Sequence, residues 1–378
     1  MNKIIDGGNC MLKKFEVTNF MGFKDKISLD FSDHKDYEFN KEFIKNNIIN
    51  KALIYGKNGT GKSNLGYAIF DITYHLTDKR KLQMRTNNYT NGDNDKKFAT
   101  FVYVFQFGDN EIKYEYAKTN PLNLLYEKLY VNNELILNYD FTTKNFVVLK
   151  INGAENYNKN ITENVKTVIR NLYYSVSLTE DSPIRLMVDF VDRMLWFRCI
   201  DEGPQFSGYM ELPKLLADMI NENSTVEDFE KFLNDNDLNY DLNIKKDIIN
   251  NLNVIMAKYK YSEFPLNAIW STGTHALTLF YCWSLEFNKV SFLYLDEFDA
   301  FYHYETSEYV LKILNKNENL QSIVTSHNTY LMNNSLTRPD CCFIISNNKV
   351  QNLCNCTNKE IREAHNLEKM YRNGIFEN

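Results

Sequence analysis

The most constraining feature of this sequence is a glycine-rich octapeptide that separates an apolar run from a helical pattern. The octapeptide spans 56–63, has the sequence GKNGTGKS, and fits the pattern G-x-x-x-x-G-K-[S/T]. It follows a short apolar run at 51–55, and apolar residues recur at helical spacing in the next segment, 64–76. A strand, a glycine loop and a helix in this order predict a phosphate-binding P-loop, because glycines let backbone N–H groups close around phosphate oxygens at a helix N-terminus. A chance glycine-rich turn is the alternative.

The P-loop pattern predicts ATP and Mg²⁺ as ligands. Lys62 is expected to reach the β- and γ-phosphates, and Ser63 is expected to bind Mg²⁺. The predicted nucleotide-binding residues of the loop are Gly56, Asn58, Gly59, Thr60, Gly61, Lys62, Ser63 and Asn64.

A pair of adjacent carboxylates, Asp296 and Glu297, follows a second apolar run at 291–295. Ligands of open α/β sheets bind at the carboxyl ends of the strands, where this pair is predicted to lie. Asp296 is expected to hold Mg²⁺, and Glu297 to polarise the attacking water. Two acidic residues at a strand end are also common as a helix N-cap, so the pair is informative only together with the P-loop.

Alternation of apolar and polar residues predicts antiparallel strands in two regions. Residues 12–31 predict two strands and a turn, and residues 98–150 predict hairpins that turn at 108–110 and 132–133. The stretch 85–97 has no apolar period and predicts a mobile surface loop.

Helical signals dominate the region 162–261. Ser182-Pro183 is typical of a helix start, residues 224–227 have capping-box spacing, and apolar residues between 248 and 256 form a stripe. After residue 290, strands alternate with helices, which predicts a largely parallel sheet that also receives the strand at Leu53.

Composition excludes some classes of protein. The 378 residues include 43 basic and 49 acidic ones, a net charge of −6, so the chain lacks the overall basic character of a protein that coats nucleic acid, although a local basic patch is still possible.

The seven cysteines include close pairs at 341–342 and 354–356 without a matching His or Cys-x-x-Cys nearby, and we expect reduced thiols in a cytoplasmic protein. The uncharged stretch 264–285 is too polar for a membrane span and predicts a buried loop and helix.

The order of further motifs resembles the ABC-type ATPases of the SMC, RecF and overcoming-lysogenisation-defect group. The opening LKKFEVTNFMGFK is similar to the first strand of this group, and the segments 271–274 (STGT), 298–300 (FDA) and 325–328 (TSHN) occur in the corresponding order. The implied fold class is α/β, a P-loop ABC-type ATPase head with an antiparallel β subdomain and a helical insertion. The expected segments are a flexible extension at 1–10, the N-terminal half of the head at 11–97, the antiparallel β subdomain at 98–160, the helical insertion at 161–262 and the C-terminal half of the head at 263–378.

The resemblance also implies roles for single residues. Ser271 and Gly273 of one subunit would complete the ATP site of another, Asp299 would lie at the dimer interface, and His327 would sense the γ-phosphate. The group usually has a glutamine that touches Mg²⁺ and the attacking water, and Gln106 is the candidate here, with a surface-facing strand glutamine as the alternative. Taken alone, His327 would be a structural histidine. The aromatic cluster 302–304 has two interpretations, a catalytic group or part of a dimer interface.

Towards the C-terminus the sequence resembles a narrower set, the AAA family ATPases of bacterial abortive-infection and antiphage systems. The segments that carry this resemblance are 296–303 (DEFDAFYH), 338–340 (RPD) and 365–374 (HNLEKMYRNG). The ATPase subunit of the PARIS system and restriction-linked ATPases are similar. The resemblance implies hydrolysis of ATP to ADP and phosphate by a homodimer or higher homo-oligomer, which acts as a sensor or scaffold, responds to a phage-derived trigger and controls a separately encoded toxin or nuclease.

Two other functions stay open at this point. A RecF-like clamp of DNA repair would need a basic track and salt-sensitive DNA binding. A scaffold that binds ATP and barely hydrolyses it would have oligomerisation as its whole function. Because the motifs occupy most of the length, we expect the effector to be a separate protein rather than a segment of this chain.

Overall fold

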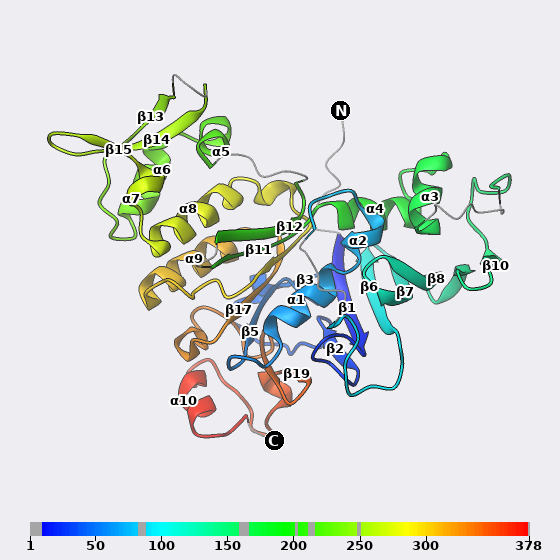
Figure 1. Ribbon diagram of the computed structural model, residues 1–378. Coiled ribbons are helices and arrows are strands. Elements are labelled where there is room, and N and C mark those ends of the chain that lie inside the picture. Colours follow the sequence, from blue (N-terminus) through cyan, green and yellow to red (C-terminus); the bar gives the residue numbers. More distant parts are fainter. Residues whose placement is uncertain are drawn as a thin grey trace.

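The computed structural model describes residues 10–81, 88–158, 166–200, 203–210, 216–247 and 251–376. Within these residues, two seven-stranded sheets share one apolar cluster and form the body of the molecule (Figure 1). The predicted extension at 1–10 lies outside the described residues except for Cys10, which begins β1.

The central sheet has the strand order β12-β11-β16-β17-β5-β18-β19. Its five inner strands are parallel, and the two edge strands pair antiparallel to their neighbours. This confirms the predicted parallel sheet and the inclusion of the strand at Leu53. The strands of this sheet are β5 (Lys51–Tyr55), β11 (Met194–Ile200), β12 (Gly203–Gly208), β16 (Phe292–Leu295), β17 (Gln321–Ser326), β18 (Cys342–Ser346) and β19 (Lys349–Asn352).

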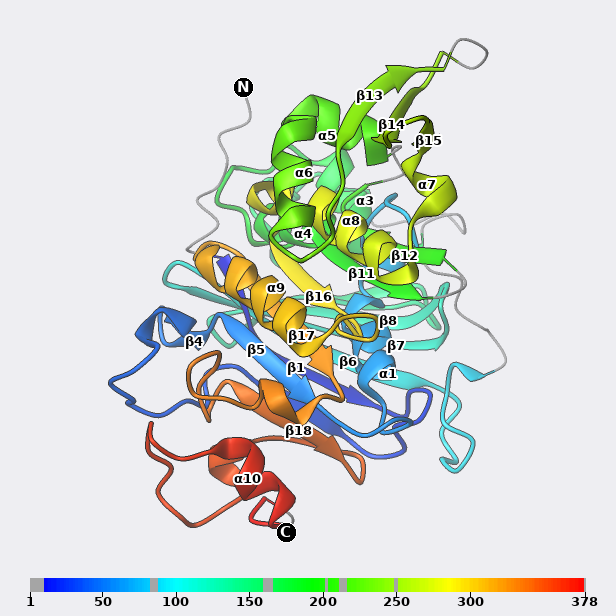
Figure 2. The same cartoon turned by 90° about the vertical axis from the view of Figure 1, so that its left-hand side faces the viewer.

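The two faces of the central sheet bury different apolar clusters, because successive side chains of a strand point to opposite faces. In β5, Ala52 and Ile54 belong to one cluster, whereas Leu53 and Tyr55 belong to the other. The antiparallel sheet and α1 (Lys62–Phe70) cover the first face. Helices α8 (Thr272–Ser284) and α9 (Tyr304–Lys316) cover the second face, and Figure 2 shows them in front of the central strands.

The second sheet is antiparallel throughout, with the order β10-β9-β8-β7-β6-β1-β2. Asn132 and Asn133 both have positive φ, 47° and 69°, as a two-residue type I′ turn requires, so the predicted hairpin at this position is confirmed. The strands are β1 (Cys10–Thr18), β2 (Ile27–Asp30), β6 (Ala99–Phe107), β7 (Asn110–Asn120), β8 (Asn123–Val131), β9 (Glu134–Asp140) and β10 (Asn145–Leu149). A two-stranded ribbon, β3 (Ile44–Lys45) and β4 (Ile48–Ile49), lies between β2 and β5 in the chain.

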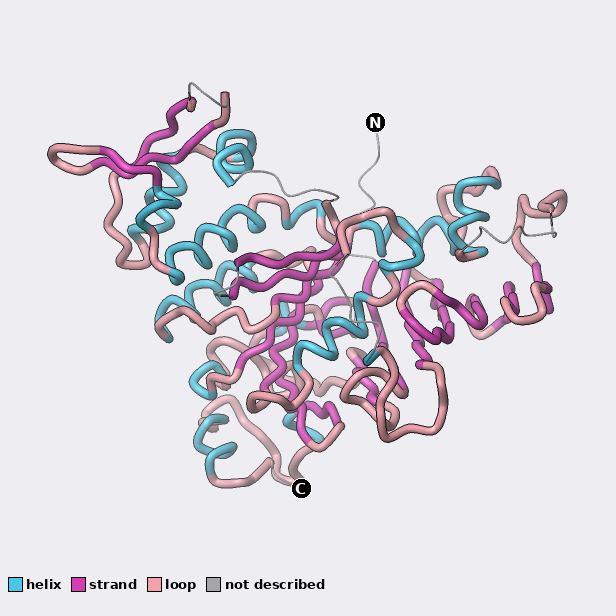
Figure 3. The backbone as a smooth tube through the Cα atoms, in the orientation of Figure 1, coloured by secondary structure: helices cyan, strands magenta, loops and turns pink. Residues whose placement is uncertain are grey.

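The region 161–262, predicted to be a helical insertion, is mixed. It contributes β11 and β12 to the central sheet, and it contains β13 and β14 of a separate three-stranded sheet, which projects from the body beside α5 and α6 (Figure 3). The predicted helical stripe between 248 and 256 is wrong where it is described, because 253–258 is a strand that pairs with both neighbours. Residues 248–250 lie outside the described part. The strands of the projecting sheet are β13 (Leu242–Lys246), β14 (Asn253–Lys258) and β15 (Glu263–Pro265).

The remaining helices are short. The start predicted at Ser182-Pro183 is confirmed, whereas the cap of α6 is Thr225 rather than Ser224, because its hydroxyl accepts from the backbone N–H of Asp228. These helices are α2 (Thr73–Leu76), α3 (Val168–Ser175), α4 (Pro183–Asp192), α5 (Leu216–Asn223), α6 (Val226–Asn234), α7 (Leu266–Ile269) and α10 (Leu367–Arg372). Short 3₁₀ turns occur at Lys41–Phe43, Phe287–Lys289, Thr329–Leu331 and Leu353–Asn355.

The helix predicted for 64–76 is interrupted between α1 and α2. The Tyr103 hydroxyl hydrogen-bonds the carbonyl groups of Ala68 and Ile69 at 2.9 and 3.1 Å, at the end of α1. A side chain from the antiparallel sheet thus satisfies carbonyl groups that the helix end leaves open.

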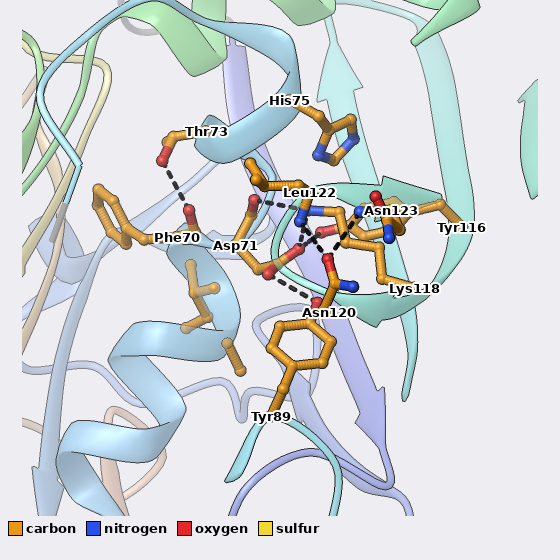
Figure 4. Close-up of polar contacts among 12 residues, drawn as sticks. Phe70, Asp71, Thr73, His75, Tyr89, Tyr116, Lys118, Asn120, Leu122 and Asn123 are labelled. Atoms are coloured by element: carbon orange, nitrogen blue, oxygen red, sulfur yellow. Dashed lines mark hydrogen bonds and ion pairs between the residues drawn. The ribbon is translucent and has the colours of Figure 1, made fainter. Parts of the chain in front are cut away.

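The residue that follows α1, Asp71, is buried and lies at the centre of a polar network (Figure 4). Its carboxylate accepts hydrogen bonds from Tyr89 (2.8 Å), Tyr116 (2.9 Å) and the ammonium group of Lys118 (2.6 Å). Burial lowers the pKa of Lys118, and the negative charge of Asp71 acts in the opposite direction. The network connects the distal end of the P-loop helix to β7, so the helix and the antiparallel sheet are held as one unit.

The uncharged stretch 264–285 forms the end of β15, then α7 and α8. The predicted buried helix is confirmed for α8, whereas the predicted buried loop is wrong, because the part before α8 forms a strand end and a short helix and is largely exposed. Within the described ranges, no helix has both the length and the apolar character that crossing a membrane requires. The six cysteine side chains that the structure describes form no disulfide.

Candidate nucleotide-binding site

The glycine loop between β5 and α1 adopts a conformation that needs glycine at three positions. Gly59 and Gly61 have φ values of 80° and 104°, in the left-handed region that side chains disfavour. A Cβ atom on Gly56 would lie 2.5 Å from Ile345 Cγ2, and one on Gly61 would lie 2.8 Å from the ring of Phe23. The loop therefore lies closely against β18 and the β1–β2 turn, while residues 57–59 at its tip are exposed.

Lys62, the first residue of α1, is buried and bends back over the loop. Its Nζ atom donates to the carbonyl oxygen of Gly56 at 2.8 Å and to that of Lys57 at 3.3 Å. Its own carbonyl accepts a 2.6 Å hydrogen bond from the hydroxyl of Tyr294 on β16. The first turn of α1 is thereby anchored to the strand that carries the acidic pair.

Asp296, directly after β16, is fully buried in the site. Its Oδ1 atom accepts a 2.8 Å hydrogen bond from the hydroxyl of Thr325. Burial raises the pKa of Asp296, and the hydroxyl groups of Ser63 and Thr325 and the charge of Arg198 act in the opposite direction. Ser63 of the P-loop and Asp296 of the acidic pair are thus brought together, as the sequence predicted for an Mg²⁺ site.

Glu297 has a backbone conformation that is uncommon for its residue type. Its φ is 48°, and its N–H donates to Thr325 Oγ1 at 2.8 Å. The side chain is half-buried. Non-glycine residues in the left-handed region are stabilised by their surroundings and are frequent at functional sites, which agrees with the role predicted for Glu297.

The side chain of Asp299, the next acidic residue, is buried within this subunit and is not exposed at the surface. Its Oδ2 accepts a 2.6 Å hydrogen bond from Ser326, and burial raises its pKa, against the charges of His327 and Lys62. His327 itself is exposed. The structure therefore gathers the end of β17, the acidic pair and the P-loop lysine around Asp299.

Ser271 and Gly273 lie at the N-terminal end of α8. The Ser271 hydroxyl caps this helix by accepting from the N–H of Thr274 at 3.1 Å, and the residue is exposed. A Cβ atom on Gly273 would lie 3.0 Å from the carbonyl oxygen of Phe301, so this glycine permits close packing against the loop after the acidic pair.

Gln106 is not brought to the site. Its side-chain amide donates to the carbonyl of Gly108 in the β6–β7 turn, and it lies opposite Met11 at the start of β1. The P-loop lies against Phe23, in the turn that follows the C-terminal end of β1. At that end of β1, Thr18 pairs with Thr100 of β6. Gln106 lies six positions after Thr100 on β6, which at about 3.3 Å per residue amounts to ~20 Å.

Two residues for which the sequence predicted no role complete the site. Thr325 bonds to both acidic residues, and its position two residues before His327, at a strand end, was the available signal. Arg198 on β11 places Nη1 3.6 Å from Asp296 Oδ2. It was missed because its segment was predicted to be helical.

The oxygen atoms that Asp296 and Ser63 offer show whether this site suits Mg²⁺. Asp296 Oδ2 is buried, and within the described part of the chain it has no hydrogen-bond partner. A carboxylate oxygen beside the hydroxyl of Ser63 is the kind of hard donor set that Mg²⁺ prefers. The residues present therefore fit this ion.

A parallel sheet with a P-loop after one strand and an acidic pair after another defines the class of P-loop nucleotide-binding proteins. The chain's residues 51–333, more than half of its 378 residues, match the family described as "AAA domain, putative AbiEii toxin, Type IV TA system". The chain belongs to this family, which confirms the predicted membership of the AAA family of P-loop ATPases.

Comparison with solved structures finds heads of SMC proteins. The chain is similar to the SmcHead bound to the C-winged helix domain of ScpA (TM-score 0.46, 15% identity, covering 90% of this chain and 96% of that one). It is also similar to the SMC head domain from Thermotoga maritima (0.41, 16%, 90% and 97%). A third is the Smc head domain with an extended coiled coil bound to the C-terminal domain of ScpA derived from Pyrococcus furiosus (0.43, 14%, 90% and 95%). The comparison with curated proteins finds no match.

Proposed function

We propose that this protein binds ATP with Mg²⁺ and hydrolyses it to ADP and phosphate. The observation that carries the proposal is the Oδ2 atom of Asp296, which is buried beside the P-loop residue Ser63 and, among the described residues, accepts no hydrogen bond of normal geometry. Burying a carboxylate oxygen without a hydrogen bond is costly, so its position beside the P-loop favours a metal-binding role over a structural one.

Each residue of the site has a distinct part in this proposal. The loop N–H groups and Lys62 bind the phosphates, and Lys62 exchanges its contact with the Gly56 carbonyl for a phosphate oxygen. Ser63 and Asp296 hold Mg²⁺, which when bound neutralises charge on the phosphates. Glu297 orients the attacking water and accepts its proton, and Thr325 fixes the backbone of Glu297 and the carboxylate of Asp296.

We further propose that two copies of the chain close around two nucleotides. Ser271 and Gly273 are at the start of α8, where the exposed Ser271 is suited to contacts in trans, and His327 is exposed beside Asp299. ATP should therefore convert monomers to dimers, as measured by light scattering after size exclusion. Ser271→Arg should prevent this conversion while leaving ATP binding intact; dimerisation of that variant would count against the arrangement.

The biological role that we propose is that of a sensor or scaffold in an antiphage system, acting on a separately encoded toxin or nuclease. The support is the resemblance of segments 296–303, 338–340 and 365–374 to abortive-infection ATPases, together with a family description that names a toxin of a type IV system. Affinity purification from the native host, with and without phage, tests this role. Copurification of a nuclease or toxin would support it, whereas recovery of repair proteins and DNA alone would contradict it.

One observation favours the alternative of a DNA-repair clamp. The outer face of the antiparallel sheet has a hollow of about 510 Å³ that Lys14, Lys26, Lys96 and Lys113 line. Glu16 and Glu115 lie among these lysines and form ion pairs with them, which reduces the basic character of the surface. Duplex DNA binding that weakens steeply with salt, and that is lost when these lysines are replaced, would favour the clamp.

A further inference from the structure

Arg198 is a charged residue within the site to which no role has been given. It lies on β11, next to β16 in the central sheet, and the register pairs Phe197 with Leu295. The N–H of Asp296 bonds to the carbonyl of Phe197 at 3.0 Å, so the backbone itself sets Arg198 beside Asp296. The Nη1 to Oδ2 distance of 3.6 Å is that of an ion pair without a close hydrogen bond.

In the described part of the chain, the ion pair leaves one hydrogen-bonding atom of Arg198 and one of Asp296 without a hydrogen bond. Among the described residues, neither Arg198 Nε nor Asp296 Oδ2 has a hydrogen-bond partner, although both atoms are buried. A buried carboxylate without a cation would be strongly disfavoured, and a guanidinium at this distance supplies the compensating charge without occupying the oxygen. The oxygen therefore remains available to a metal ion while its charge is balanced.

Arg198 also contacts an aromatic ring. Its guanidinium carbon lies 5.8 Å from the ring centroid of Trp196, a cation–π contact, and Trp196 packs against Tyr67 of α1 with ring centroids 5.6 Å apart. A guanidinium is weakly hydrated and stacks on aromatic faces, so it can move away from Asp296 without losing all of its stabilising contacts.

We infer that Arg198 is a resident counter-cation of Asp296, which balances this carboxylate before Mg²⁺ arrives and yields the Oδ2 atom to the ion when nucleotide binds. The inference rests on the proposed function, because it takes Asp296 as the metal carboxylate. Arg198 acts through Asp296 and is a positioning residue rather than a catalytic one. If Arg198 has this part, the wild-type protein should bind nucleotide even without Mg²⁺, because the charge of Asp296 near the phosphates is already balanced.

The test compares ADP affinity in EDTA with ADP affinity in Mg²⁺ by titration calorimetry, which needs no hydrolysis. Arg198→Gln should raise the ratio of the two dissociation constants, EDTA over Mg²⁺, at least tenfold above the wild-type ratio, because only the metal can then balance Asp296. Arg198→Lys, which keeps the charge, should stay within threefold of the wild type. Arg193→Gln, at the residue that directly precedes β11, is the matched control and should leave the ratio unchanged.

A ratio for Arg198→Gln within twofold of the wild type would overturn the inference. If Arg198→Gln does not fold, the double variant with Asp296→Asn decides the matter. Folding of the double variant supports a counter-cation, because the charge to be balanced has gone, whereas its failure to fold would show that Arg198 has a structural role and would contradict the inference. Absence of any ADP or ATP binding by the wild type would instead refute the proposed function.

Discussion

The hydroxyl of Thr325 donates a 2.8 Å hydrogen bond to Asp296 Oδ1 and accepts one of 2.8 Å from the backbone N–H of Glu297. One side chain at the end of β17 therefore sets the position of both carboxylates at the end of β16. The two strands are adjacent and parallel, so this contact depends only on the register of the central sheet.

Thr325→Val should lower turnover at least tenfold with a smaller change in KM, because the acidic pair loses its shared hydroxyl while the phosphate-binding loop stays intact. The unpaired groups should also lower the free energy of unfolding by about 1–3 kcal/mol. Steady-state kinetics and urea unfolding measure the two effects. Thr325→Ser retains the hydroxyl and should restore most of the turnover; equal loss in both variants would count against hydrogen bonding as the cause.

Lys118→Met should destabilise the protein by about 3–5 kcal/mol, because the Asp71 carboxylate would remain buried without its cation. Chemical denaturation measures this loss. Lys150→Met removes an exposed ion pair with Glu134 and should have little effect. Lys118 and Asp71 would have no special role in holding α1 if both variants unfolded at the same denaturant concentration.

His75 should make the protein less stable as the pH falls below about 6.5. Burial, followed by the charges of Lys118 and Lys81, holds the pKa of His75 well below its ordinary value. The unfolded chain then binds a proton near pH 6.5 that the folded chain does not bind, so protons favour unfolding by up to about 1.4 kcal/mol per pH unit.

The measurement for His75 is the pH dependence of the free energy of unfolding between pH 7.5 and 5. His75→Phe should flatten this dependence, and His365→Gln, at an exposed position, is the control. An unchanged slope in His75→Phe would show that other groups cause the acid sensitivity.

Gly56→Ala should weaken ADP binding at least tenfold and lower stability by about 1–3 kcal/mol, because the added methyl group meets Ile345 and Thr60 at 2.5 Å. Calorimetry and thermal unfolding measure the two effects. Gly92→Ala adds a methyl group where no atom lies within 4 Å and serves as the control. Normal ADP affinity in Gly56→Ala would mean that the loop adopts a different shape when it binds phosphate.

Features that depend on local sequence were predictable. The P-loop was predicted from the glycines within eight consecutive residues. Strand β5 was predicted from the short apolar run before that loop, and all five of its residues are buried. The acidic pair was found because an apolar run stops at Asp296. In these cases the signal and the structure occupy the same short segment.

Features that depend on contacts between distant segments were not predictable. Tyr89 lies in a stretch without apolar period, predicted to be a mobile loop, yet it is buried and bonds to Asp71. Arg198 and the strand at 253–258 were assigned to a helical region because short apolar runs do not separate strands from helices. Gln106 was chosen from its strand, but the register of β6 against β1 places it at the far end.

The most direct test of the central claim is ATP turnover by Glu297→Gln, measured as phosphate release at saturating ATP and Mg²⁺. Loss of the group that accepts the proton of water should lower turnover at least a hundredfold, while ATP remains bound and the protein stays in its ATP-bound oligomer. Glu308→Gln, on the following helix, should leave turnover unchanged. A Glu297→Gln variant that releases phosphate at the wild-type rate would contradict the role of Glu297, and a wild-type protein that binds ATP without measurable turnover would identify a nucleotide-dependent scaffold instead of an ATPase.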